Sequence, residues 1–172
     1  MRKLRLAVAL FVVALSCHAA LMWKKISLGS DGAVFLPSAW TVQAQNHSVL
    51  ENAYGPGVSC RTLLTAYGGN DVSMSILEYW PCSENMLRDF VLGMAETLRR
   101  QSGSSSRPQL GDIRAGNTVA SSVTFRANSE YSQKVAAFCE KGKIYCLIAA
   151  YKSSTEREMQ YIVRNIVNRW KL

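Results

Sequence analysis

Cysteine is the residue type in this chain with the clearest capacity for covalent chemistry. An even number of cysteines in an exported domain predicts two disulfides, and four of the five cysteines lie beyond the N-terminal segment: Cys60, Cys82, Cys139 and Cys146. A hairpin with a Gly142-Lys143 turn would place Cys139 opposite Cys146. Cys60 and Cys82 flank a second predicted hairpin, so they are also expected to lie near each other. Four buried free thiols are the alternative.

The remaining residues form no recognisable catalytic or metal-binding pattern. The segment 57–61 begins like the turn that presents a serine nucleophile, but Arg61 stands where the second glycine is required. His47 is the only histidine after residue 20, and no paired Cys-x-x-Cys accompanies it, so zinc is not expected. In an oxidising compartment, disulfide formation competes for any thiol of a Cys–His catalytic pair. We therefore expect no catalytic residue, no metal site and no cofactor.

Aromatic residues near predicted loop ends are the better sign of function. Exposed aromatic anchors beside an arginine are typical of protein interfaces, and this chain has Arg61 together with Trp40, Tyr54, Tyr67, Tyr79 and Trp80. Binding residues also favour loops on a rigid scaffold, which draws attention to the predicted loops 46–57 and 101–108. The alternative is that Trp40 and Trp80 simply cap the core.

The first twenty residues predict export. A basic start, Met1–Arg5, precedes an apolar run over Leu6–Leu15 and then small residues, as in a secretory signal. We therefore interpret residues 1–20 as an export signal and expect the mature chain in the periplasm. Three outcomes stay open: simple cleavage after Ala19, lipidation of Cys17 at a site that resembles a lipobox, and retention as a membrane anchor.

Length and composition predict one globular domain over residues 21–172. Hydrophobic residues make up 48% of the chain and charged residues 19%, which excludes the disordered class. Without the three basic residues of the predicted signal, 17 basic and 12 acidic residues leave a net charge of +5. This bias favours an anionic membrane surface, peptidoglycan or an acidic protein. The basic residues are not clustered, so a nucleic-acid partner is not expected.

Hydrophobic periodicity predicts an order of short strands and two main helices. Extended segments are expected at 25–28, 33–36, 41–44, 59–67, 72–80, 112–115, 118–126, 133–139 and 144–151. One amphipathic helix is expected from Ser83 or Asn85 to Gln101. The last helix is expected to start at a capping box over Thr155–Glu158 and to carry an apolar stripe from Met159 to Trp170. Such a helix usually packs on a sheet, although a basic amphipathic helix can also bind a membrane.

Four short segments carry a resemblance that covers nearly the whole mature chain. They are Val34–Trp40, Ala115–Ala120, Gly142–Tyr151 and Ile162–Val167, and with the order of elements they resemble the PsbP-like family, which includes extrinsic photosystem proteins and bacterial DcrB-type envelope proteins. The resemblance implies an α+β fold, with a central antiparallel sheet of about six strands flanked by two main helices. It also implies a non-catalytic binding or assembly role.

These observations together favour a non-enzymatic, exported protein that binds a protein partner in the bacterial periplasm or envelope. Within that class, the chain is either an immunity protein that neutralises a toxin delivered to the periplasm, or an assembly or accessory factor. Membrane association through the N-terminus is compatible with both roles. The alternatives from other classes are a small secreted hydrolase and a protein that binds a membrane surface or a small ligand.

Overall fold

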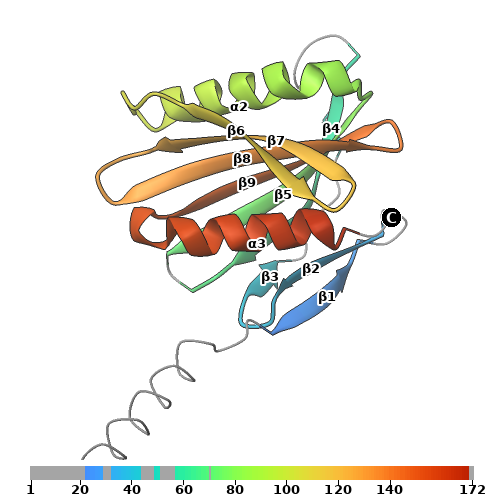
Figure 1. Ribbon diagram of the computed structural model, residues 1–172, viewed down its shortest axis with the longest axis horizontal. Coiled ribbons are helices and arrows are strands. Elements are labelled where there is room, and N and C mark those ends of the chain that lie inside the picture. The colour runs from blue at the N-terminus through green and yellow to red at the C-terminus, as the bar shows by residue number, and fades with distance from the viewer. Residues whose placement is uncertain (1–21, 29–31, 44–48, 51–56, 70, 171–172) are drawn as a thin grey trace, which may run out of the picture.

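The computed structural model describes residues 22–28, 32–43, 49–50, 57–69 and 71–170 (Figure 1). Its strands are β1 (Trp23–Ser27), β2 (Ala33–Pro37), β3 (Thr41–Gln43), β4 (Ser59–Tyr67), β5 (Val72–Trp80), β6 (Gln109–Ala115), β7 (Thr118–Arg126), β8 (Tyr131–Glu140) and β9 (Lys143–Lys152). The main helices are α2 (Leu87–Gln101) and α3 (Glu156–Asn168), each entered through a short 3-10 turn. The predicted export signal, with Cys17, lies outside the described residues.

The strands form one large sheet and one small hairpin. Seven strands pair antiparallel in the order β3-β4-β5-β9-β8-β7-β6, and β1 pairs with β2 separately. This confirms the expected α+β fold around an antiparallel sheet. The sheet has one strand more than the six expected, and the pairing of Thr41–Gln43 with β4 gives it β3 as one of its edges.

The two helices cover opposite faces of the sheet, as Figure 1 shows. α2 packs over β7 and β8 and buries Leu87, Val91, Met94 and Ala95. α3 and the β1–β2 hairpin cover the other face. The apolar stripe of α3 is buried there, so this helix packs on the sheet as expected. Among the described residues, neither helix combines the length and apolar content needed to cross a membrane.

The start of α3 differs from the expected capping box. Thr155 occupies the N-cap position, but its side chain makes no capping hydrogen bond. Its hydroxyl instead donates to the carbonyl oxygen of Lys152 at 2.8 Å, at the end of β9. Because this bond occupies the hydroxyl, the tight turn between β9 and α3 replaces the capping box predicted from the sequence.

The disulfide links a different cysteine pair from those predicted. Cys82 is bonded to Cys139, with their Cα atoms 6.2 Å apart. Lys141 and Gly142 both have positive φ angles, as a two-residue hairpin turn of this type requires, so Cys139 lies opposite Ile144 instead of Cys146. The N–H of Cys82 donates to the carbonyl of Gly142 at 2.9 Å, which brings Cys82 to the same hairpin. A turn one residue earlier than expected therefore changes the pairing.

Cys60 and Cys146 are buried free thiols on the face of the sheet that α2 covers. Burial raises the pKa of both thiols, and the nearby Cys60 raises that of Cys146 further. We expect neither thiol to react with a maleimide in the folded, oxidised protein, and both to react once urea unfolds it, since the thiolate is the reactive form. Rapid labelling of the native chain, detected by mass spectrometry, would contradict this burial.

Candidate functional site

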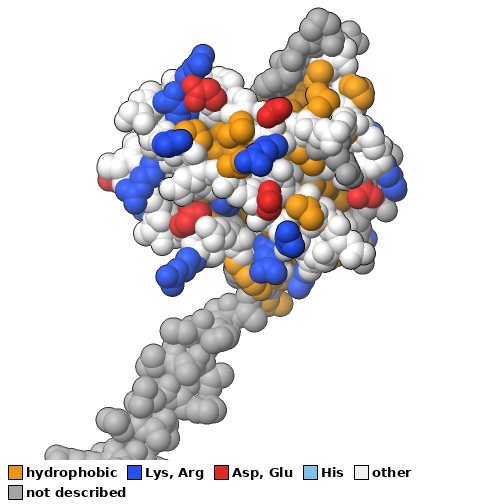
Figure 2. All heavy atoms as spheres, turned by 45° about the horizontal axis from the view of Figure 1, so that its top comes forward, with side chains coloured by type: hydrophobic (Ala, Val, Ile, Leu, Met, Phe, Trp, Pro, Cys, Tyr) orange, Lys and Arg blue, Asp and Glu red, His pale blue; other side chains and the backbone are white. Residues whose placement is uncertain are grey.

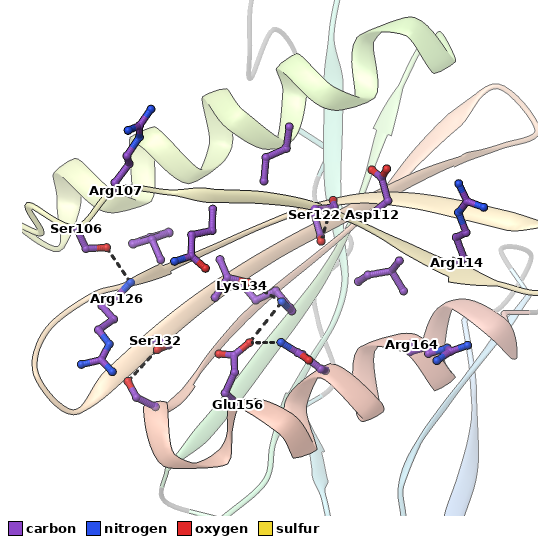
Figure 3. A pocket seen from close by; sticks show the side chains of 18 residues that line it. Ser106, Arg107, Asp112, Arg114, Ser122, Arg126, Ser132, Lys134, Glu156 and Arg164 are labelled. Atoms are coloured by element: carbon purple, nitrogen blue, oxygen red, sulfur yellow. Dashed lines mark hydrogen bonds and ion pairs between the residues drawn. The ribbon is translucent and has the colours of Figure 1, made fainter.

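A hollow with a volume of about 1060 Å³ lies between the edge of the sheet and α3. It is called the groove below. Its walls are β6 along Gln109–Arg114 and the side of α3 that carries Glu156, Gln160 and Arg164, and its floor is formed by β7 and β8 (Figure 3). Ser106 and Arg107, from the loop between α2 and β6, also line it. The groove therefore combines five separate parts of the C-terminal half of the chain: a loop, three strands and a helix.

The loop at the end of the groove is attached to β7 by serine side chains. Ser106 Oγ accepts a hydrogen bond from the backbone N–H of Arg126 at 2.9 Å. Ser104 Oγ donates to the carbonyl oxygen of the same residue at 2.5 Å. These bonds satisfy the backbone of β7 where β6 no longer pairs with it. The predicted loop 101–108 is thus held in place beside the groove.

The floor of the groove is polar, although it belongs to the face of the sheet that carries one of the two cores. Ser122 on β7 and Ser132 and Lys134 on β8 are only 4% to 6% exposed. Ser122 Oγ donates to the carbonyl of Gly111 at 3.1 Å, and Ser132 Oγ lies 2.8 Å from Ser153 Oγ. Burying a polar group costs free energy unless a hydrogen bond compensates it, so each of these hydroxyls depends on its partner, and apolar residues would avoid that requirement.

Lys134 is the most costly of these floor residues because it brings a charge. Its Nζ donates to Thr124 Oγ1 at 2.5 Å and lies 3.7 Å from Glu156 Oε1. Burial lowers the pKa of this lysine, and the Glu156 carboxylate opposes that shift only in part. The fold therefore places an ammonium group in the groove at a cost in stability.

Glu156, the first residue of α3, completes a hydrogen-bonded network with Lys134. Its Oε2 accepts from the hydroxyl of Tyr151 at 2.5 Å, and its Oε1 accepts from Gln160 Nε2 at 2.9 Å. Burial, together with the nearby carboxylate, raises the pKa of Tyr151, so this hydroxyl stays protonated as a donor. Figure 3 shows Lys134 and Glu156 facing each other, the contact that links β8 to α3 across the groove.

Lys134→Met is expected to make the fold more stable, by about 1 kcal/mol at neutral pH, because burial lowers the pKa of Lys134 even beside Glu156, so the folded state disfavours the charged lysine. Glu156 is partly exposed and keeps Tyr151 and Gln160 as donors, so its carboxylate is not left buried without partners. In the wild type, the folded-state pKa of Lys134 lies below its unfolded value. As the pH approaches the ordinary lysine value of about 10.4, the unfolded chain therefore binds more protons than the folded chain. Wild-type stability then rises relative to that of the variant. Urea denaturation of both proteins over this pH range measures the difference. A variant that is clearly less stable would contradict it.

The charges that line the groove are mostly positive. They comprise five cationic side chains, Arg107, Arg114, Arg126, Arg164 and Lys134, and two carboxylates, Asp112 and Glu156. Within the described part of the chain, the four arginines make no ion pair. On the face shown in Figure 2, by contrast, Lys and Arg side chains lie scattered among acidic and hydrophobic ones. The lining therefore carries an excess of positive charge, which an anionic ligand would neutralise.

The expected aromatic interface is only partly exposed. Trp40 is 7% and Tyr79 is 1% exposed, so both belong to the core and the expectation of exposed anchors is wrong for them. The ring of Trp40 lies against Gly68, where an added Cβ would approach Nε1 to 2.5 Å, so this packing needs a glycine. Tyr79 packs edge-on against Phe90 of α2, with ring centroids 5.0 Å apart.

The other members of that predicted set have different surroundings. Arg61 donates from Nε to the buried carboxylate of Glu78 at 2.5 Å, which gives it a structural partner. Tyr67 is 41% exposed and donates from its hydroxyl to Gln43 Oε1. Trp80 is half-buried, and Tyr54 lies outside the described residues. None of the described members lines the groove, so a role for Tyr67 and Trp80 in partner binding stays a prediction.

Several residues of the groove could have been recognised in the sequence. Polar residues recur at every second position of two consecutive strands, at Ser122, Thr124 and Arg126 and again at Ser132 and Lys134. Such alternation normally marks a solvated face, and that is how the sequence suggests interpreting β7. A groove differs from an ordinary solvated face because the same side of these two strands becomes buried a few residues away, at Ala120 and Ala136. Of the two loops expected to contact a partner, the loop 101–108 borders the groove through Ser106 and Arg107, and its contact with a partner stays a prediction.

The described residues contain few groups that could take part in acid–base or metal chemistry. They contain no histidine, and no group of three or more His, Cys, Asp or Glu residues among them is placed to hold a metal ion. The Thr124 hydroxyl beside the Lys134 amine is the one pairing of a hydroxyl with a potential base on the groove floor. The polar floor and the charge fit an anionic ligand, and the volume lies at the upper end of the range of about 300–1,000 Å³ that is usual for ligand pockets.

No family model matches the chain, and no curated protein matches it. Among solved structures, the solution structure of cyanobacterial PsbP (CyanoP) from Synechocystis sp. PCC 6803 is similar, with a TM-score of 0.58 and 12% sequence identity. The match covers 90% of this chain and 95% of that protein. It extends over nearly the entire arrangement of strands and helices, as the resemblance in the sequence implies. The chain therefore has a PsbP-like fold.

Proposed function

We propose that this chain is a non-enzymatic, exported protein that binds a protein partner in the bacterial periplasm or envelope, and that the groove is the binding site. The observation that carries the proposal is the buried polar floor with Lys134 at its centre. Natural sequences depart from the most stable choice mainly where function requires it. Here the departure occurs in the groove, whose lining also carries four arginines without an ion-pair partner among the described residues.

Export is supported by two independent features. The N-terminal segment has the residue types of a secretory signal. A disulfide joins Cys82 to Cys139, and disulfides persist mainly in oxidising compartments. The PsbP-like fold adds an analogy with an accessory role and carries no information about the partner.

Two roles fit this proposal, an immunity protein and an assembly or accessory factor. An immunity protein would cover the active site of a toxin, so its partner would be a single enzyme held in a stoichiometric complex. An assembly factor would instead be recovered with several subunits of an envelope complex. Both roles need a rigid scaffold and a charged docking site, and the identity of the partner separates them.

Reversing charge in the groove is expected to abolish partner binding without unfolding the chain. Arg114 and Arg164 are the residues to change, because both are exposed and reach the groove from opposite walls. The double variant Arg114→Glu/Arg164→Glu should lose the partner captured by the tagged wild type from its envelope fraction. Arg88→Glu is the matched control, because Arg88 is an exposed arginine of α2 outside the groove lining.

The captured protein must be identified by mass spectrometry and its complex rebuilt from purified components. A reconstituted complex lost in the double variant and kept in Arg88→Glu supports the proposal. A partner that binds all three proteins equally would place the interface elsewhere, with Tyr67 and Trp80 as the next residues to test. Recovery of no stoichiometric partner would count against a protein-binding role.

A small hydrolase is the second candidate, and the Thr124–Lys134 pair is the feature that favours it. A hydroxyl 2.5 Å from a lysine whose pKa is lowered by burial has the elements of a nucleophile with its base. Glu156 opposes this role, since a carboxylate 3.7 Å away favours the charged lysine. Thr124→Val separates the candidates: it should abolish any esterase activity on p-nitrophenyl esters if the pair is catalytic, and leave partner binding largely intact if it is not.

A further inference from the structure

We infer that the occupant of the groove is an extended, acidic segment of the partner, which pairs with the outer edge of β6 as an eighth strand of the sheet. The inference rests on the proposed function and specifies how the partner is recognised. It starts from the position of β6, which ends the sheet and pairs only with β7 in the described part of the chain. An edge strand presents unpaired N–H and C=O groups, and these can bind another strand.

The lining of the groove indicates that it follows this edge. Successive side chains of a strand point to opposite faces of the sheet. A hollow on one face of β6 would therefore be lined by every second residue, such as Gln109, Gly111 and Ile113. All six residues from Gln109 to Arg114 line the groove. The hollow must then reach the backbone edge of the strand, where a second strand would pair.

The size of the groove fits a peptide strand. Six residues of β6 extend for about 20 Å, so a partner segment of about six residues would match them. A floor of small side chains, Ser122, Thr124 and Ser132, leaves room beneath that segment for alternate side chains to reach Lys134. Strand addition supplies backbone hydrogen bonds, and the pockets beneath it supply specificity.

The charges decide which side chains the segment carries. Alternate residues of an added strand would face the groove, where Lys134 and the unpaired Arg126 and Arg164 lie. Carboxylates at those positions would complete the charge balance of the groove. Complementary charge also steers the partner to the site and excludes cationic or neutral segments.

The same charges argue against a second copy of this chain as the occupant. Antiparallel pairing of two β6 strands centred on Asp112 would place the two Asp112 carboxylates opposite each other, and like charges in that position are destabilising. It would also bring together two grooves that are each rich in arginine. A different, acidic chain fits the edge better than a copy of this one.

The test uses a displayed library of random octapeptides, selected against the oxidised, exported protein at physiological salt. The expected result is enrichment of peptides with Asp or Glu at alternate positions. Binding of the best synthetic peptide should weaken about tenfold in Arg164→Glu and about tenfold in Lys134→Met, and should not change in Arg88→Glu. Circular dichroism and urea denaturation verify that each variant is folded. Affinity should fall as salt is raised.

Two measurements test the strand itself. Amide hydrogen exchange at alternate residues of 110–114 should slow at least tenfold when the peptide binds, because outward N–H groups gain partners. An added strand bonds to β6 through every second backbone N–H. N-methylation of those amides of the peptide should therefore abolish binding, and N-methylation of the amides between them should not. Enriched peptides without acidic residues, binding unchanged in Arg164→Glu, unchanged exchange along β6, or no enrichment at all would each overturn the inference.

The outcome is separable from that of the proposed function. A reconstituted envelope partner that binds through Tyr67 or Trp80, with no protection of β6, would leave a protein-binding function and reject strand addition. Acidic peptides that bind along β6, with no envelope protein captured, would support strand addition and count against the proposed cellular role.

Discussion

Glu78→Ala is expected to lower the free energy of unfolding by about 3–5 kcal/mol, one of the largest effects that a single substitution can have in a domain of this size. The side chain of Glu78 is fully buried in β5. Its carboxylate lies 2.5 Å from Arg61 Nε and 2.5 Å from Lys143 Nζ, and it accepts a longer bond from the Tyr145 hydroxyl. Removing it leaves two cations without the carboxylate that holds them together and creates a cavity beside Tyr145.

Urea denaturation monitored by circular dichroism measures this loss. Glu96→Gln is the matched control, because Glu96 also bonds two cations, Arg99 and Arg100, but on the surface of α2. Those arginines lower the pKa of Glu96 to about 2, so any contribution it makes is present above its ordinary pKa and disappears as the pH falls toward 2. At neutral pH the control should unfold near the wild-type midpoint. An equal loss in both variants would mean that burial does not set the cost.

Breaking the Cys82–Cys139 bond is expected to remove about 4 kcal/mol of stability, the second large effect. The bond joins residues 57 positions apart, so it restricts a long loop in the unfolded chain. It also ties the end of β5 to the β8–β9 hairpin, where Cys82 already donates a backbone hydrogen bond to Gly142. The wild type in reductant and the double variant Cys82→Ser/Cys139→Ser should therefore unfold at similar, lower urea concentrations.

The two buried thiols provide the control for this experiment. The variant Cys60→Ala/Cys146→Ala should still respond to reductant as the wild type does, because neither residue takes part in the disulfide. Peptide mapping under non-reducing conditions should recover the segments around Cys82 and Cys139 as one linked species. A stability unaffected by reductant would contradict the expected contribution of this bond. A mapped link between Cys139 and Cys146 would show that the hairpin has the register expected from the sequence.

The chain illustrates how local patterns predict elements better than they predict contacts. Helix α2 was expected to end at Gln101 and does so, because its apolar residues recur at helical spacing and that spacing is a local property. The strand 118–126 was expected with the bounds that β7 has, for the corresponding reason. The prediction of a capping box at Thr155 is wrong, because its hydroxyl donates to the carbonyl of Lys152. Lys152 is the last residue of β9, so this bond depends on where that strand ends.

The amino-acid sequence by itself determined the α+β class, the order of strands and helices, and the likeness to PsbP-like proteins, because each follows from residue spacing along the chain. The tertiary structure decided three other matters. It joined Cys82 to Cys139 through a one-residue shift in a turn, and it buried Trp40 and Tyr79. It also left the polar side of β7 and β8 facing a groove, because α3 lies beside that part of the sheet without filling it. Each of these depends on which strands become neighbours and which face a helix covers, and those relations join residues far apart in the sequence.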